Sequence, residues 1–85
     1  MDRKTIFTEL KKVLAPYTEN KEMLDGITEE TDLIKDLKIN SANLVDIIID
    51  AESQYNIEID SDSAEKMYKV GSCINVIIDK MNQSA

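Results

Sequence analysis

The chain has 85 residues, enough for one domain with a modest core, and a chain this short rarely builds a deep catalytic cleft of its own. Asp and Glu number 17 against 10 Lys and Arg, and the net charge of −7 disfavours nucleic acids and anionic lipid surfaces as partners and favours basic proteins. The chain has no histidine, the commonest general base near neutral pH, and its single cysteine, Cys73, excludes an internal disulfide and a cysteine-based zinc cluster.

The beginning of the chain, MDRKTIFTEL, lacks the apolar stretch of a signal peptide, and no apolar run is long enough to span a membrane. With only one cysteine, this favours a cytoplasmic protein that does not insert into membranes. No repeat or linker divides the sequence, so we expect one domain over residues 1–85. We also expect a monomer.

A first helix is predicted from about Asp2 to Ala15, and Pro16 ends it. Five residues recur on one helical face: Ile6, Leu10, Val13, Leu14 and Tyr17. The segment from Thr18 to Asn40 has no regular period and is expected to be a long loop with a turn at Asp25-Gly26. We expect its apolar residues to pin the loop across the core: Met23, Leu24, Ile27, Leu33, Ile34, Leu37 and Ile39.

A second helix is predicted to begin after Asn40 and to run to about Tyr55, with Asn40 or Ser41 capping its first free N–H groups. After a break at Asn56 and a short extended link, a short third helix is predicted over Asp62 to Met67, entered through Ser61. The last helix is predicted from about Ser72 to Met81, with Val70 before it as a hydrophobic staple. Its inward residues are expected to be Ile74, Ile77, Ile78 and Met81. No segment alternates like a strand, so the predicted fold class is all-α: a four-helix bundle of three longer helices and one short one, with a long first loop.

The second predicted helix has three faces when its residues are placed at about 100° per residue. Its core face comprises Leu44, Ile47, Ile48, Ala51 and Tyr55, and its solvent face comprises Asn43, Asp46, Asp50 and Ser53. An apolar shoulder lies beside the acidic residues and is formed by Ala42, Val45 and Ile49. Ser41 lies at the helix start, so the pattern describes a docking surface around an attachment point. The alternative is that the long loop covers Val45 and Ile49.

The segment from Thr31 to Ser41, TDLIKDLKINS, resembles acyl carrier proteins, and so do the residues that follow it: Leu44, Val45, Ile48 and Glu52. The resemblance continues through Ile57-Glu58-Ile59 to Ile77 and covers about residues 27–81. It implies a four-helix bundle in which a phosphopantetheinyl transferase moves 4'-phosphopantetheine from coenzyme A to Ser41. The thiol of this arm would hold acyl or aminoacyl groups as thioesters, for fatty acid, polyketide or nonribosomal peptide biosynthesis. By position, the resemblance also implies that basic partner enzymes dock on Ala42, Val45, Asp46, Ile49 and Glu52.

The attachment motif differs from the family pattern at three positions. Asn40-Ser41-Ala42 stands where the family usually has Asp-Ser-Leu, and Lys38 replaces a common Gly. Asn40 keeps the cap but removes a charge that the family's transferases recognise, and Ala42 offers less apolar contact than Leu. These differences indicate a specialised carrier. They also favour the alternative function, an unmodified acidic adaptor of the same fold that binds one protein partner through the same helix.

Other patterns give no sign of catalysis or metal binding. The residues from Asp60 to Glu65 resemble the start of a calcium loop, but Ala64 stands where a ligand is needed and Glu65 replaces the turn glycine. Cys73 has no histidine to activate it and is expected in or beside the core. No catalytic residue and no metal site are predicted, so we expect a carrier and not an enzyme.

Overall fold

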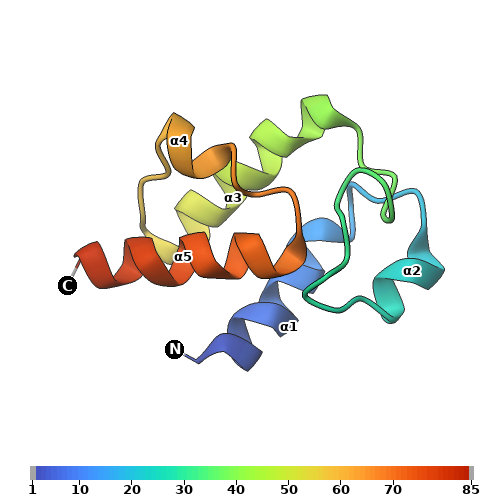
Figure 1. The fold of residues 1–85 in the computed structure, drawn as a ribbon, viewed down its shortest axis with the longest axis horizontal. Helices are drawn as coiled ribbons and strands as arrows, with labels where there is room; N and C mark the ends of the chain where they lie inside the picture. Colours follow the sequence, from blue (N-terminus) through green and yellow to red (C-terminus); the bar gives the residue numbers. More distant parts are fainter. Residues whose placement is uncertain (1, 85) are drawn as a thin grey trace.

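The computed structural model describes residues 2–84, which fold into helices joined by turns (Figure 1). Three long α-helices form the body of the molecule: α1 (Arg3–Leu14), α3 (Leu44–Tyr55) and α5 (Val70–Ser84). Two short α-helices, α2 (Lys21–Asp25) and α4 (Ser61–Ala64), lie in the connections, and a 3₁₀ turn, η1 (Ser41–Asn43), leads into α3. The described residues form no β-strand, only an isolated bridge between Asp32 and Lys69. The predicted all-α class is therefore confirmed.

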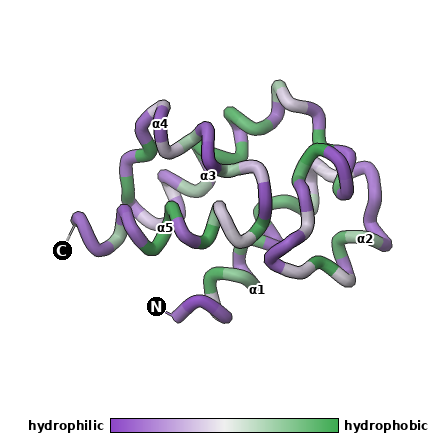
Figure 2. Tube along the Cα trace, viewed as in Figure 1, coloured by the Kyte–Doolittle hydropathy of each residue, from purple (hydrophilic) through white to green (hydrophobic). Residues whose placement is uncertain are grey.

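The three long helices enclose the core, since α1 contacts both α3 and α5, and α3 contacts α5. Figure 2 shows hydrophobic residues recurring along these helices between hydrophilic ones. In α1 the predicted face is confirmed, because Ile6, Leu10 and Leu14 are buried and Val13 and Tyr17 pack partly buried against them. In α5 the fully buried residues are Val70, Cys73, Ile74 and Ile77. Within residues 2–84, no helix combines the length and the apolar character needed to cross a membrane.

The ends of α5 and α4 differ from the predicted ones. α5 begins at Val70 and ends at Ser84, although Ser72 and Met81 were expected. It starts early because the long connection accepts its first N–H groups: Val70 N–H donates to Thr31 O at 3.0 Å and Gly71 N–H to Glu29 O at 2.9 Å. Val70 is thus a buried residue of the helix and not a staple before it.

α4 ends at Ala64, three residues before the predicted end at Met67. The N–H groups of Lys66 and Met67 donate to the carbonyls of Ser63 and Ala64, three residues back, so the chain continues in turns and not in an α-helix. The helix also begins one residue early, because Ser61 is its first residue and Asp60 precedes it.

The long connection between α1 and α3 contains α2, which the irregular apolar pattern does not predict. Asn20 caps this helix, because its Oδ1 accepts the Met23 N–H at 3.1 Å. The predicted pinning across the core is confirmed for five of the seven apolar residues: Leu24, Ile27, Leu33, Leu37 and Ile39. It is wrong for Met23 and Ile34, which are exposed because their neighbours Leu24 and Leu33 take the inward positions.

Candidate functional site

Ser41 is exposed at the first position of η1, directly before α3. Asn40 is the residue that caps this turn: its Oδ1 accepts the Ala42 N–H at 2.9 Å and its carbonyl accepts the Asn43 N–H at 2.8 Å. The Ser41 hydroxyl makes no hydrogen bond to any residue that the structure describes. It is therefore an accessible hydroxyl at the start of the helical turn that leads into α3.

The chain that leads into Ser41 is fixed to the core on both sides of Lys38. Leu37 and Ile39 are buried. The hydroxyl of the buried Thr18 donates to the Leu37 carbonyl, and Ile39 N–H donates to Leu33 O at 3.1 Å. Thr18 gave no signal in the sequence, because its partner is a backbone carbonyl 19 residues away. The segment directly before Ser41 is therefore anchored to the core.

The apolar shoulder on α3 is open to solvent. Val45 is 59% exposed and Ile49 is 54% exposed, and Ala42 is exposed one turn before Val45. The alternative in which the long loop covers Val45 and Ile49 is excluded by these exposures. The spacing of Ala42, Val45 and Ile49 places them on one side of the helix, beside Ser41.

The three carboxylates on α3 differ in what they already bind. Asp46 is exposed and forms no hydrogen bond or ion pair with the described residues. Asp50 accepts a hydrogen bond from the Tyr17 hydroxyl at 2.9 Å, which raises the pKa of Tyr17. Glu52 is partly buried, and its Oε2 accepts the Ile59 N–H at 2.8 Å. Asp46 is thus the carboxylate with the most free capacity for a partner.

The predicted core face of α3 is only partly closed. Ile47 and Ala51 are buried, whereas three of its predicted members are partly buried and pack against the core: Leu44, Ile48 and Tyr55. The Tyr55 hydroxyl donates to Glu9 Oε1 at 2.7 Å. Burial, followed by this bond, raises the pKa of Tyr55.

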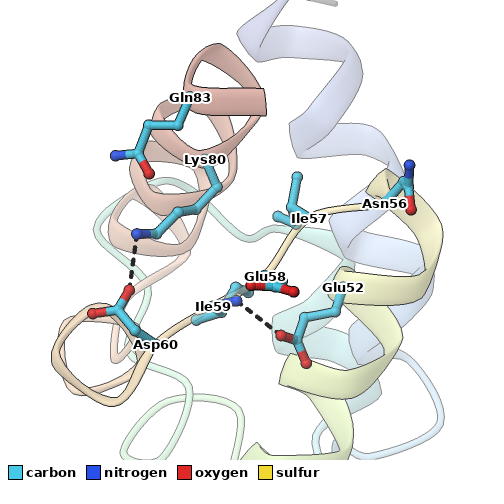
Figure 3. A pocket seen from close by; sticks show the side chains of 8 residues that line it. All are labelled: Glu52, Asn56, Ile57, Glu58, Ile59, Asp60, Lys80 and Gln83. Atoms are coloured by element: carbon cyan, nitrogen blue, oxygen red, sulfur yellow. Dashed lines mark hydrogen bonds and ion pairs between the residues drawn. The ribbon is translucent and has the colours of Figure 1, made fainter. Parts of the chain in front are cut away.

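An open hollow of about 980 Å³ lies at the other end of α3 (Figure 3). It is lined by Glu52, Asn56, Ile57, Glu58, Ile59, Asp60, Lys80 and Gln83. Lys80 Nζ and Asp60 Oδ1 are 2.8 Å apart, and bonds from Lys80 and Ser63 hold the pKa of Asp60 well below its usual range. No three side chains in the described part of the chain are grouped to hold a metal ion. Of the predicted docking residues, only Glu52 borders this hollow.

Cys73 is fully buried, as expected for a core residue. Burial raises the pKa of its thiol to about 12, so the reactive thiolate is scarce at neutral pH.

No protein-family model matches the sequence, and no curated protein sequence matches it significantly. Among solved structures, the acyl carrier protein from Enterococcus faecalis is similar, with a TM-score of 0.76 and 21% sequence identity. The match covers 94% of this chain and 99% of that chain. This likeness shows that the chain has the fold of an acyl carrier protein. The resemblance seen in residues 27–81 is thereby confirmed for the fold.

Proposed function

We propose that this protein is a carrier whose Ser41 holds 4'-phosphopantetheine. One observation carries the proposal: in a fold shared with an acyl carrier protein, Ser41 presents an exposed hydroxyl at the turn before α3, and none of the described residues hydrogen-bonds to it. When attached, the arm supplies a terminal thiol that holds acyl or aminoacyl groups as thioesters. The chain itself supplies attachment and docking, and partner enzymes supply the catalysis.

The residues around Ser41 have distinct roles in this proposal. Asn40 holds the turn in shape through its bond to the Ala42 N–H. The partial positive charge at the start of a helix favours a phosphodiester on Ser41, typically by about 0.3–1 kcal/mol. The buried Leu37 and Ile39 keep the attachment point fixed while the arm moves.

Docking of partner enzymes is proposed on Ala42, Val45, Asp46, Ile49 and Glu52. Val45 and Ile49 offer apolar contact, and Asp46 offers a carboxylate that forms no hydrogen bond or ion pair with the residues that the structure describes. Such a surface suits phosphopantetheinyl transferases and acyl- or aminoacyl-transferring enzymes with basic surfaces. Exposed charge pairs are weak and screened by salt, which suits a carrier that must leave each enzyme again.

The second candidate function is an unmodified acidic adaptor. The exposed Val45 and Ile49 serve this function equally well, and Asn40 and Ala42 depart from the attachment motif of the carrier family. In that case Ser41 stays unmodified, and the α3 surface binds one protein partner.

Intact mass spectrometry after incubation with coenzyme A, Mg²⁺ and a broad-specificity phosphopantetheinyl transferase tests the proposal. We expect a gain of one phosphopantetheine, localised to Ser41 by peptide mapping. Ser41→Ala abolishes the gain without changing the thermal melt, because the Ser41 hydroxyl has no partner within the described residues. The matched control Ser53→Ala, an exposed serine on α3, is loaded normally. A folded protein that is not loaded, even by transferases of its own host, would contradict the proposal and favour the unmodified adaptor.

A further inference from the structure

Lys38 has a backbone conformation that its residue type rarely adopts. Its φ is 58°, and Asn56 is the other non-glycine residue with a positive φ in the described chain. Asn tolerates this left-handed region, whereas a lysine pays a steric cost that glycine would avoid. Residues with a strained backbone cluster at functional sites, so the strain at Lys38, close to the candidate site, indicates a function for its side chain.

The fold fixes where the Lys38 side chain begins. Its neighbours Leu37 and Ile39 are both buried, while Lys38 itself is exposed. Ser41 follows after three residues, so three Cα–Cα steps of 3.8 Å keep the two Cα atoms within about 11 Å. The flexible four-carbon stem of lysine can span the gap that remains to a group attached to Ser41.

Two lysines, Lys35 and Lys38, and two carboxylates, Asp36 and Asp46, lie within six residues of Ser41, in a chain whose net charge is −7. Lys35 and Lys38 are exposed and form no ion pair with the described residues. Of the two carboxylates, Asp36 already accepts the Asp32 N–H at 2.8 Å. Residues 39–45 carry no charge, so Lys38 is the charged residue closest to Ser41 along the chain.

We propose that Lys38 binds the phosphate group attached to Ser41, with its ammonium donating to a non-bridging phosphate oxygen. This inference rests on the proposed function, because the phosphate arrives with the arm. This contact with the phosphate would be the function of the Lys38 side chain. It also fixes the first bonds of the arm on the Lys38 side of the turn.

The test uses two probes: the protein loaded with phosphopantetheine, and the protein with O-phosphoserine genetically encoded at position 41. Lys38→Gln keeps a side chain and the left-handed strain but removes the charge. Lys4→Gln removes the same charge from an exposed position on α1 and serves as the control. The phosphoserine probe reports on the contact even where no transferase loads Ser41.

The second pKa of a phosphoserine is ordinarily about 6. We expect ³¹P NMR to show that this pKa is lower in the phosphoserine protein with Lys38 than in its Lys38→Gln variant, by about 0.3 pH units. We expect loading to raise the Tm of the wild type more than that of Lys38→Gln, by about 2 °C. Lys4→Gln should behave like the wild type in both measurements.

Equal phosphate pKa values and equal Tm gains in Lys38→Gln and Lys4→Gln overturn the inference. Slower loading of Lys38→Gln with both values unchanged also overturns it and indicates that Lys38 contacts the transferase instead. Failure of the proposed function is seen separately, as the absence of any mass gain in the wild type.

Discussion

At the N-terminal end of α3, Ser41, Val45 and Asp46 are exposed, and neither the hydroxyl nor the carboxylate has a partner in the described chain. At the C-terminal end, the Glu52 carboxylate accepts the Ile59 N–H and the Tyr55 hydroxyl donates to Glu9. The polar groups at the C-terminal end of α3 therefore form hydrogen bonds within the fold, whereas Ser41 and Asp46 at its N-terminal end form none with the described residues. Free groups can exchange partners without disturbing the fold, so the proposed docking of partner enzymes is expected mainly at the N-terminal end.

The largest expected difference separates two isoleucines on α3. Ile47 is 1% exposed, and Ile47→Ala should lower the free energy of unfolding by about 3 kcal/mol through lost burial and a cavity. Ile49→Ala should change it by less, about 0.5 kcal/mol, because more than half of the Ile49 surface is already exposed. Urea unfolding followed by circular dichroism measures both. Similar losses for the two variants would contradict the assignment of Ile49 to an open shoulder.

A smaller difference is expected between two carboxylates of α3. Glu52→Ala leaves the Ile59 N–H without its acceptor and should destabilise the fold by about 1 kcal/mol, whereas Asp46→Ala should stay within about 0.5 kcal/mol. The same urea series tests this, and Glu52→Gln should restore most of the loss.

Asp46→Lys is accordingly the cleaner probe of electrostatic docking, and we expect it to slow partner turnover at low salt. Equal turnover of Asp46→Lys and the wild type would argue against that docking.

The strain at the N-terminal end is tested by Lys38→Gly. Glycine accepts the left-handed backbone of Lys38, so this variant should be more stable by about 0.5 kcal/mol after the entropy of glycine in the unfolded chain is included. Thermal melting of the unloaded protein measures the change, and Lys38→Gln should melt like the wild type. A destabilised Lys38→Gly variant would show that the Lys38 backbone is not strained.

The smallest effect is the pH dependence from the paired carboxylates. Bonds from Lys80 and Ser63 to Asp60, and from Arg3 to Glu29, lower the pKa of both acids. A carboxyl group whose pKa is lower in the folded protein than in the unfolded chain stabilises the fold at pH values above its unfolded pKa of about 4. This stabilisation is lost as the pH falls through the pKa of the folded state. The Tm should therefore drop below about pH 4, and the drop should be shallower in Asp60→Asn. An identical profile in that variant would exclude a contribution from Asp60.

Helical periodicity predicts the parts of this fold that lie on long helices. Ile6, Leu10 and Leu14 follow the period over several turns, so their burial is correctly predicted. The same period places Val45 and Ile49 outside the core, where the structure finds them. When apolar residues recur at the helical period over several turns, they identify the side of the helix that faces the core.

The contacts that the sequence does not predict join segments without a shared period. α2 is five residues long and completes little more than one turn, so only the Asn20 cap marks it. Glu52 bonds a backbone N–H in a non-helical link, and Tyr17 bonds Asp50 across 33 residues. Such pairs depend on how the helices are placed in space, and that information is not present in local spacing.

The arrangement of the chain ends bears on how this protein can be handled. α1 begins and α5 ends on one side of the molecule, whereas η1 and the long connection lie on the other (Figure 1). An affinity tag, a surface linker or a fused fluorescent domain at either end would therefore project away from Ser41. In samples immobilised through either end, Ser41, the proposed attachment site, should stay accessible to added enzymes.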